Sequence, residues 1–293
     1  MWVSLTLLLY LILLIILLKR IKEMKLKYKV FILIYNLVLG FGFLYFLENT
    51  FKVSQKIMAK QTSPLTITEQ RVQDYKIRVL EPKIFPIKDS VLLDAPLIRQ
   101  YPELPRGCEV TSLAMLLQFA NVNVGKMQLA REIEKDQTPY TIKEGNIYWG
   151  DPNKGFLGDM YSFDNPGYGV YHKPIKNLAN KYLPGQVVNL TGKSFQELKV
   201  YLSQDIPIWV ITNTTFKKLP NSSFQTIVTP TGEKVNITYK EHSVLVTGYD
   251  QEYVYINEPI AGEKNKKVSL NEFVEAWEQM GSQAISYLPS NYQ

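Results

Sequence analysis

The pattern of apolar and polar residues changes near residue 47. Before that point, residues 2–18 and 30–47 form two almost unbroken apolar runs. After it, apolar residues recur in short groups among polar ones. With ~1.5 Å of rise per residue, each run as a helix would match the hydrocarbon thickness of a bilayer. The pattern therefore predicts a two-helix transmembrane hairpin over residues 1–47.

The stretch between the two runs carries most of the positive charge of the chain. Its basic residues are Lys19, Arg20, Lys22, Lys25, Lys27 and Lys29, against the single acidic Glu23. Positive charge beside a span stays on the cytoplasmic side, so both ends of the chain are expected outside the cell membrane. A cleaved signal peptide is the alternative, but no basic segment precedes the first run and no A-x-A site follows either run. Both interpretations place the rest of the chain in an extracytoplasmic location.

Residues 48–91 are polar, with weak helical periodicity, and are interpreted as a stalk or as a segment packed on the domain. From residue 92 onward the pattern predicts an α+β domain that runs to residue 293. Helical spacing is found at residues 108–120, 129–136, 175–183, 194–205 and 270–280. Short β-branched and aromatic runs predict strands at 206–214, 224–230, 234–240, 242–250 and 253–259. Residues 138–171 are predicted to be loop.

The amino-acid composition says little about the fold, but it limits the kinds of chemistry that the chain can perform. Apolar residues make up 46% and charged residues 20% of the 293 positions, as in an ordinary folded protein. The net charge of +6 comes mainly from residues 19–29, and no basic patch interleaved with aromatic residues indicates nucleic-acid binding. A single cysteine excludes an intramolecular disulfide, and two histidines leave few candidates for a general base.

The one cysteine, Cys108, lies at the predicted start of a helix. The free N–H groups and the dipole at a helix N-terminus favour negative charge, so this position is expected to lower the thiol pKa and to promote a nucleophilic thiolate. The N–H of Cys108 could also bind an oxyanion, and Gly107 permits a tight turn before it. The alternative for a lone cysteine is a buried structural role.

A base for this nucleophile is found at the start of a predicted strand. His242 opens the strand, and a hairpin brings Asn257 and Glu258 back beside it. Either side chain could accept a hydrogen bond from the imidazole and fix its tautomer. The other histidine, His172, lies in a turn-rich segment and lacks a carboxylate brought back by a hairpin.

Three stretches, QYPELPRGCEVTSLAM, EHSVLVTGYD and YVYINEP, resemble the C39-like peptidase family of papain-like cysteine peptidases. The resemblance implies a papain-like fold, in which a helix bearing the cysteine packs on an antiparallel sheet bearing the histidine. It also implies that Gln100 helps to form an oxyanion hole. The family usually has aspartate where this chain has Glu258, so Asn257 stays open as the residue that orients His242.

The predicted function is that of an extracytoplasmic cysteine peptidase or amide hydrolase that acts through an acyl-enzyme, with no metal or cofactor. Its expected partner is a peptide or cell-envelope peptide substrate. A non-catalytic peptide-binding or sensing module and a thiol acyltransferase or transpeptidase remain as alternatives. Aromatic residues of the 138–171 segment are expected to form one wall of the substrate cleft; they are Trp149, Phe156, Tyr161, Phe163 and Tyr168.

Overall fold

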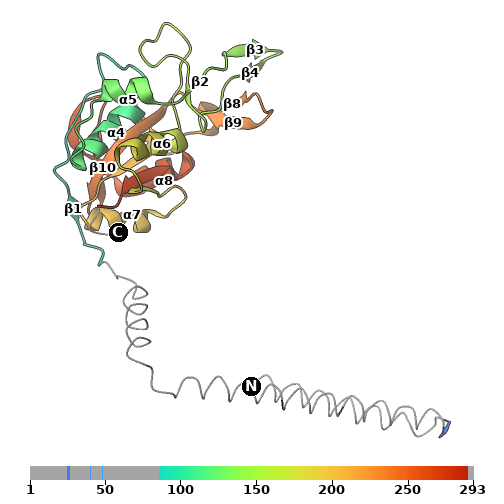
Figure 1. Ribbon diagram of the computed structural model, residues 1–293, viewed down its shortest axis with the longest axis vertical. Helices are drawn as coiled ribbons and strands as arrows, with labels where there is room; N and C mark the ends of the chain where they lie inside the picture. The colour runs from blue at the N-terminus through green and yellow to red at the C-terminus, as the bar shows by residue number, and fades with distance from the viewer. Residues whose placement is uncertain (1–24, 27–39, 41–47, 49–85, 290–293) are drawn as a thin grey trace. The chain divides into compact units, whose positions relative to one another are not determined.

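A computed structural model describes residues 25–26, 40, 48 and 86–289. The chain divides into two compact units, residues 1–82 and 83–293, and the fold below is that of the second unit (Figure 1). The predicted transmembrane hairpin and most of the predicted stalk lie outside the described residues. Within the described positions, no helix combines the length and apolar character needed to cross a bilayer.

An antiparallel sheet forms the centre of this unit, in the strand order β12-β11-β10-β7-β13-β6. The strands are β6 (Val187–Asn189), β7 (Ile208–Asn213), β10 (Glu241–Tyr249), β11 (Tyr253–Glu258), β12 (Glu263–Ser269) and β13 (Ala284–Tyr287). The short β1 (Val91–Leu92) pairs with the far end of β10. Every residue of β7 and β10 is buried, because helices cover both faces of these central strands.

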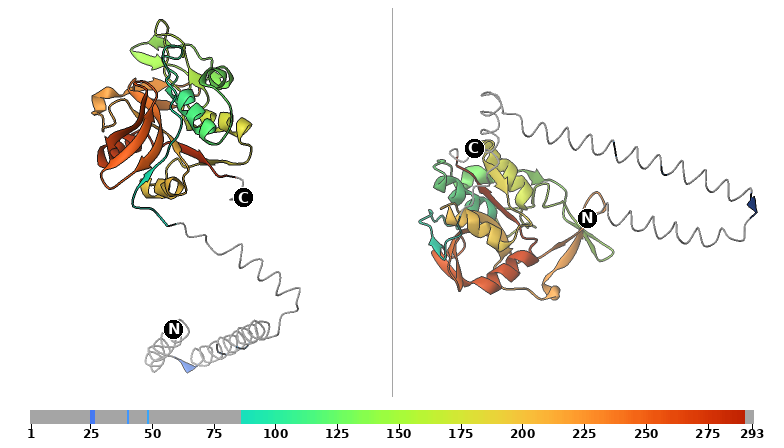
Figure 2. Two further views of the ribbon diagram at one scale, coloured as in Figure 1. Left: turned by 90° about the vertical axis from the view of Figure 1, so that its left-hand side faces the viewer. Right: turned by 90° about the horizontal axis from the view of Figure 1, so that it is seen from below.

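Alternate residues of the central strands enter two separate hydrophobic clusters, as the two-residue period of a strand requires. Leu245 of β10 packs with α4 (Cys108–Phe119), α5 (Lys126–Glu132) and α6 (His172–Tyr182) on one face. Val244 and Val246 pack with α7 (Phe195–Ser203) and α8 (Leu270–Gln279) on the other. Figures 1 and 2 show this layered arrangement. The predicted α+β architecture is thereby confirmed.

A smaller sheet projects from the main body (Figure 1). It contains β3 (Thr141–Lys143), β4 (Asn146–Tyr148), β8 (Gln225–Val228) and β9 (Lys234–Ile237), with the short 3-10 helix η2 (Asn221–Ser223) before β8. A separate parallel pair joins β2 (Lys135–Asp136) to β5 (Phe156–Leu157). Segments far apart in sequence therefore meet through β4 and β8, which are parallel.

Several predicted boundaries differ from the observed ones. The helix expected at 129–136 is α5 and ends at Glu132, because the chain then becomes extended and pairs as β2. The segment 138–171 was predicted to be loop but contains β3, β4 and β5. The strands expected at 224–230 and 234–240 do form a hairpin, yet they belong to the smaller sheet. The edge strand β12 was not predicted, because its sequence EKNKKVS has one apolar residue and therefore shows no apolar alternation.

Candidate active site

Cys108 is the first residue of α4, where the sequence predicted it. Gly107 caps the helix, and a Cβ at that position would lie 2.6 Å from Leu104 Cβ, so only glycine fits beside this leucine. The helix is held on the sheet by a hydrogen bond of 3.0 Å from Ser112 Oγ to the Ser243 carbonyl of β10. These contacts place the thiol at the end of β10 that carries the histidine.

His242, the second residue of β10, is held by the carboxylate of Glu258 on β11. Nε2 lies 2.7 Å from Glu258 Oε1, and both side chains are buried. Burial alone would raise the pKa of Glu258, but the hydrogen bond and charge of His242, with the Ala261 and Ile260 N–H groups, lower it below its usual value. The ionised carboxylate of Glu258 accepts a hydrogen bond from the Nε2–H group of His242. The other ring nitrogen, Nδ1, has no hydrogen-bond partner among the described residues and can accept a proton.

Asn257, the alternative for orienting His242, has other partners. Its side-chain nitrogen donates to the carbonyls of Ala95 and Pro96 at 3.1 and 3.0 Å. Its oxygen accepts the Asn265 N–H at 3.0 Å. The Asn257 amide thus ties β11 to the segment after β1, and the structure brings Glu258 to the imidazole.

Gln100, Cys108 and His242 line one cavity of about 350 Å³. Gln100 is 1% exposed, and its Nε2 donates one hydrogen bond of 3.0 Å to the Pro105 carbonyl. An amide nitrogen has two protons, so the second can serve an oxyanion. His172, in contrast, begins α6, contacts Gln283 and lines a different cavity.

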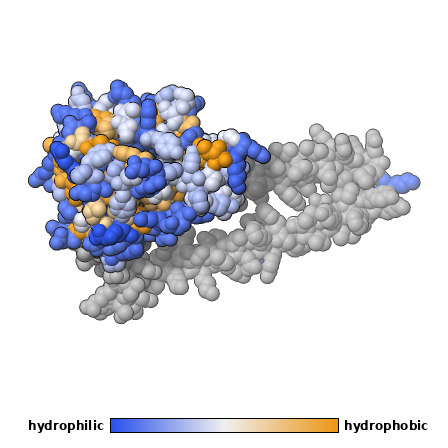
Figure 3. Space-filling view, turned by 90° about the horizontal axis from the view of Figure 1, so that it is seen from above, coloured by the Kyte–Doolittle hydropathy of each residue, from blue (hydrophilic) through white to orange (hydrophobic). Residues whose placement is uncertain are grey.

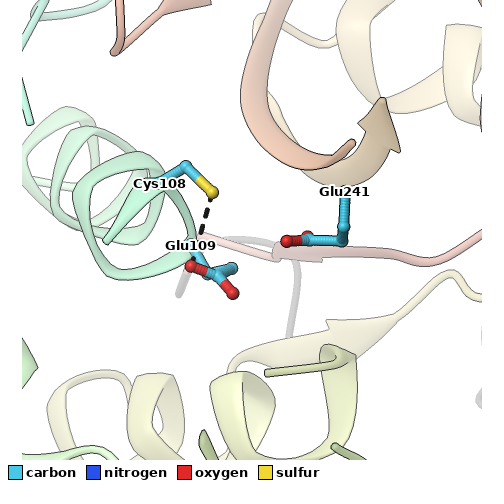
Figure 4. Close-up of side chains that lie close together, drawn as sticks. All are labelled: Cys108, Glu109 and Glu241. Carbon is cyan, nitrogen blue, oxygen red and sulfur yellow. Dashed lines mark hydrogen bonds between the residues drawn. The ribbon is translucent and has the colours of Figure 1, made fainter. Parts of the chain in front are cut away.

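The electrostatic surroundings of Cys108 differ from those expected. Its Sγ donates to Glu109 Oε2 at 3.4 Å, and Glu241 also points toward it (Figure 4). Burial, followed by the charges of Glu109 and Glu241, raises the pKa of the thiol well above its usual value. The expectation that the helix N-terminus would lower this pKa is therefore wrong. The effect of the helix end is outweighed by burial and by two acidic neighbours.

Glu109 and Glu241 form a buried acidic pair. Burial raises the pKa of Glu109 to about 7, although the Val170 N–H donates to its Oε1 at 2.7 Å. Burial and the charge of Glu109 together raise the pKa of Glu241 well above its usual value. Two close carboxylates cannot both ionise cheaply, so near neutral pH the pair retains a proton. The ligand atoms of Cys108, Glu109 and Glu241 lie within 4.8 Å of one another, a spacing that admits a small cation.

Large apolar side chains surround the mouth of the cavity. Tyr101, Phe163, Tyr239 and Ile260 line it while remaining between 38% and 62% exposed. Elsewhere the surface seen in Figure 3 is mainly hydrophilic, with scattered apolar patches. Of the aromatic residues expected at the cleft, Phe163 and Tyr168 line this cavity. Trp149, Phe156 and Tyr161 instead line a neighbouring cavity of about 600 Å³.

The fold and the site together define a class: an α+β domain in which a helix-borne cysteine and a strand-borne histidine face one cavity. The chain belongs to the Peptidase_C39 like family, whose model matches residues 92–285.

Two relatives support this assignment. The chain is 48% identical over 184 residues to the uncharacterized protein YvpB of Bacillus subtilis (strain 168), which covers 63% of this chain and 70% of that protein. It is 49% identical to a crystal structure from Bacillus anthracis assigned as a C39-like peptidase, with a TM-score of 0.64. That match covers 69% of this chain and 98% of the other. The fold is therefore that of C39-like peptidases.

The acidic pair was not identified from the sequence. Glu109 directly follows the cysteine in an otherwise uncharged helix, and Glu241 directly precedes the histidine in a fully buried strand. A charged residue inside a buried apolar segment needs a partner or a function. That signal was present in the sequence, but which acidic residues meet depends on how α4 packs against β10.

Proposed function

We propose that this protein is an extracytoplasmic cysteine peptidase or amide hydrolase. The observation that carries the proposal is the shared cavity, in which Cys108, His242 and Gln100 meet and Glu258 holds the far side of the imidazole. Nucleophile, base and orienting carboxylate are the groups that acyl transfer by a thiol requires.

The proposed reaction begins when Cys108 Sγ attacks a substrate carbonyl carbon. His242 Nδ1 takes the thiol proton, and Glu258 stabilises the imidazolium through Nε2. The negative charge on the carbonyl oxygen is bound by the Cys108 N–H and the free Gln100 N–H. His242 then protonates the departing amine, which leaves an acyl group on Cys108. Water, deprotonated by His242, releases the acid and restores the thiol.

The proposed substrates are peptides outside the cytoplasm or in the cell envelope. Four exposed apolar side chains around the cavity favour a ligand with apolar groups. One of them, Phe163, also makes a cation–π contact with Arg106, whose guanidinium lies 4.8 Å from the ring centroid. The location follows from the two apolar runs and the basic stretch between them, which support an anchor with residues 92–293 outside the membrane.

One observation favours a second candidate, a non-catalytic peptide-binding module on the same fold. The Cys108 thiol is hydrogen-bonded to Glu109 and its pKa is raised, which opposes formation of the thiolate. If binding of a peptide does not remove this barrier, the cavity would bind peptides without cleaving them.

The test is cleavage of an equimolar mixture of peptides with free and with acetylated N-termini, followed by mass spectrometry. The full chain is compared with Cys108→Ser and His242→Ala, after each variant has been shown to unfold cooperatively. We expect cleavage by the wild type, none by Cys108→Ser, and a rate roughly 10²–10⁴-fold lower with His242→Ala. Cleavage that persists in Cys108→Ser, or a wild type that binds peptides without cleaving any, would overturn the proposal.

A further inference from the structure

The acidic pair beside Cys108 has no role in the proposed reaction as described so far. A thiol peptidase needs a thiolate, yet Glu109 and Glu241 oppose negative charge on the sulfur. Buried carboxyl groups are costly unless they are paired. A positively charged partner beside the pair would let it release its proton and would offset its effect on the sulfur.

Glu241 has one carboxyl oxygen available for such a charge. The residue is 9% exposed and lines the cavity, and its Oε1 has no hydrogen-bond partner among the described residues. Figure 4 shows the carboxyl group directed toward Cys108 and Glu109. Once the carboxyl group is ionised, this oxygen accepts hydrogen bonds only, and a ligand N–H group can supply one.

The cation already in the cavity wall is not available to the pair. Arg106 lines the same cavity, but its guanidinium donates to the Asp159 and Ser162 carbonyls and lies over the ring of Phe163. The pKa of Glu241 is raised by burial and by Glu109, with no contribution from Arg106.

The position of the pair limits where a substrate could carry its positive charge. One oxygen of each carboxyl group lies within 4.8 Å of the sulfur, and the attacked carbonyl carbon would lie about 3–3.5 Å from it before reaction. The α-amino nitrogen of the residue that supplies this carbonyl is two bonds from the carbon. A lysine ammonium is six bonds away and reaches the pair only if the side chain folds back.

We propose that Glu241, backed by Glu109, is a subsite for the free amino group of the substrate, so that the enzyme removes an N-terminal residue whose α-amine is unblocked. This proposal rests on the proposed hydrolase function and specifies its substrate class. A bound ammonium offsets the charge of the pair, which promotes ionisation of Cys108 when the correct substrate is present. Tyr168 and Tyr239, whose rings lie 6.3 Å apart in the cavity wall, add aromatic surface beside the ammonium.

The subsite is tested with two reagents that modify Cys108, the only cysteine of the chain. These are 2-aminoethyl methanethiosulfonate, which carries an ammonium, and its neutral 2-hydroxyethyl analogue. In each reaction the thiolate sulfur attacks the sulfenyl sulfur, a disulfide forms and methanesulfinate leaves. The rates are followed by intact mass on the full chain, both folded and unfolded in urea, and the unfolded chain supplies the preference of a free thiol.

We expect the folded chain to favour the ammonium reagent by at least about tenfold more than the unfolded chain does. Glu241→Gln should abolish that excess, whereas Glu275→Gln, at an exposed position of α8, should leave it unchanged. A folded wild type with no excess, or an excess that survives in Glu241→Gln, would overturn the subsite. The wild-type ratio decides even if the Glu241 variant does not fold.

The peptide mixture separates this inference from the proposed function. Cleavage confined to free N-termini supports both. Equal cleavage of free and acetylated peptides overturns the amine subsite and leaves the hydrolase intact. An ammonium preference without any cleavage supports the subsite and overturns the hydrolase.

Discussion

At the scale of single residues, two neighbouring positions in the chain have different roles. Asn257 and Glu258 are adjacent on β11, yet the first side chain bonds backbone groups and the second bonds His242. Successive residues of a strand point to opposite faces, which explains why only one of the two can reach the imidazole.

Single substitutions test whether Glu258 serves catalysis and Asn257 serves stability. In Glu258→Gln the neutral amide no longer stabilises an imidazolium, and we expect peptide cleavage to slow by roughly 10²–10⁴-fold. In Asn257→Ala the carbonyls of Ala95 and Pro96 lose their donor, and we expect the free energy of unfolding to fall by about 1–3 kcal/mol. Cleavage rates and urea unfolding of both variants check this, and a larger rate loss in Asn257→Ala would contradict it.

The raised pKa of Glu109 predicts a pH-dependent stability. The folded chain keeps this proton up to about pH 7, whereas the unfolded chain loses it near pH 4.3. The free energy of unfolding therefore falls as pH rises through this window, by an amount on the order of 3 kcal/mol. Glu109→Gln should remove most of the fall, as urea unfolding at about pH 5 and pH 8 would show. If the free energy of unfolding changed between the two pH values by the same amount in the wild type and in Glu109→Gln, the prediction would be refuted.

At the scale of elements, the site depends on how β10 is held. β10 pairs with β7 and β11 along its length and with β1 at its end, where Gly248 lies opposite Leu92. A Cβ at Gly248 would lie 2.1 Å from the Val91 carbonyl oxygen, a distance that forces the two strands apart.

Gly248→Ala is therefore expected to destabilise the domain by about 1–3 kcal/mol, because the backbone of β1 must move. Gly125→Ala is the matched control, since no atom lies within 4 Å of the added methyl group and φ is −99°. The midpoints of urea unfolding measure the difference, and equal midpoints for the two variants would show that β1 contributes little.

The elements also show what the sequence could predict. The α4 helix and the β10–β11 hairpin were predicted because their apolar periods are clear, and these elements carry Cys108, His242 and Glu258. The edge strand β12 was missed because its polar, lysine-rich sequence suits an exposed sheet edge and lacks the apolar alternation that identifies a strand. The approach of Glu241 to Cys108 and Glu109 was missed because it depends on how α4 packs against β10, which no local pattern encodes.

At the scale of the whole molecule, the second unit contains every site contact that is found among the described residues. Residues 83–293 form one compact unit, and β1 already belongs to its central sheet. A chain shortened to residues 83–293 is therefore expected to fold alone with one cooperative urea transition. It should cleave peptides at the rate of the full chain. A shortened chain that stays unfolded, or that folds without cleaving what the full chain cleaves, would contradict this expectation.

The bond between Ser112 and Ser243 joins positions 131 residues apart, and this separation controls when the protein can first act. During synthesis Cys108 emerges well before His242 and Glu258 do. Until β10 and β11 are in place, Cys108 has neither a base nor a cavity. A chain that is still being made therefore carries the nucleophile of the proposed reaction without its base, and cleavage can begin only once β10 and β11 have folded.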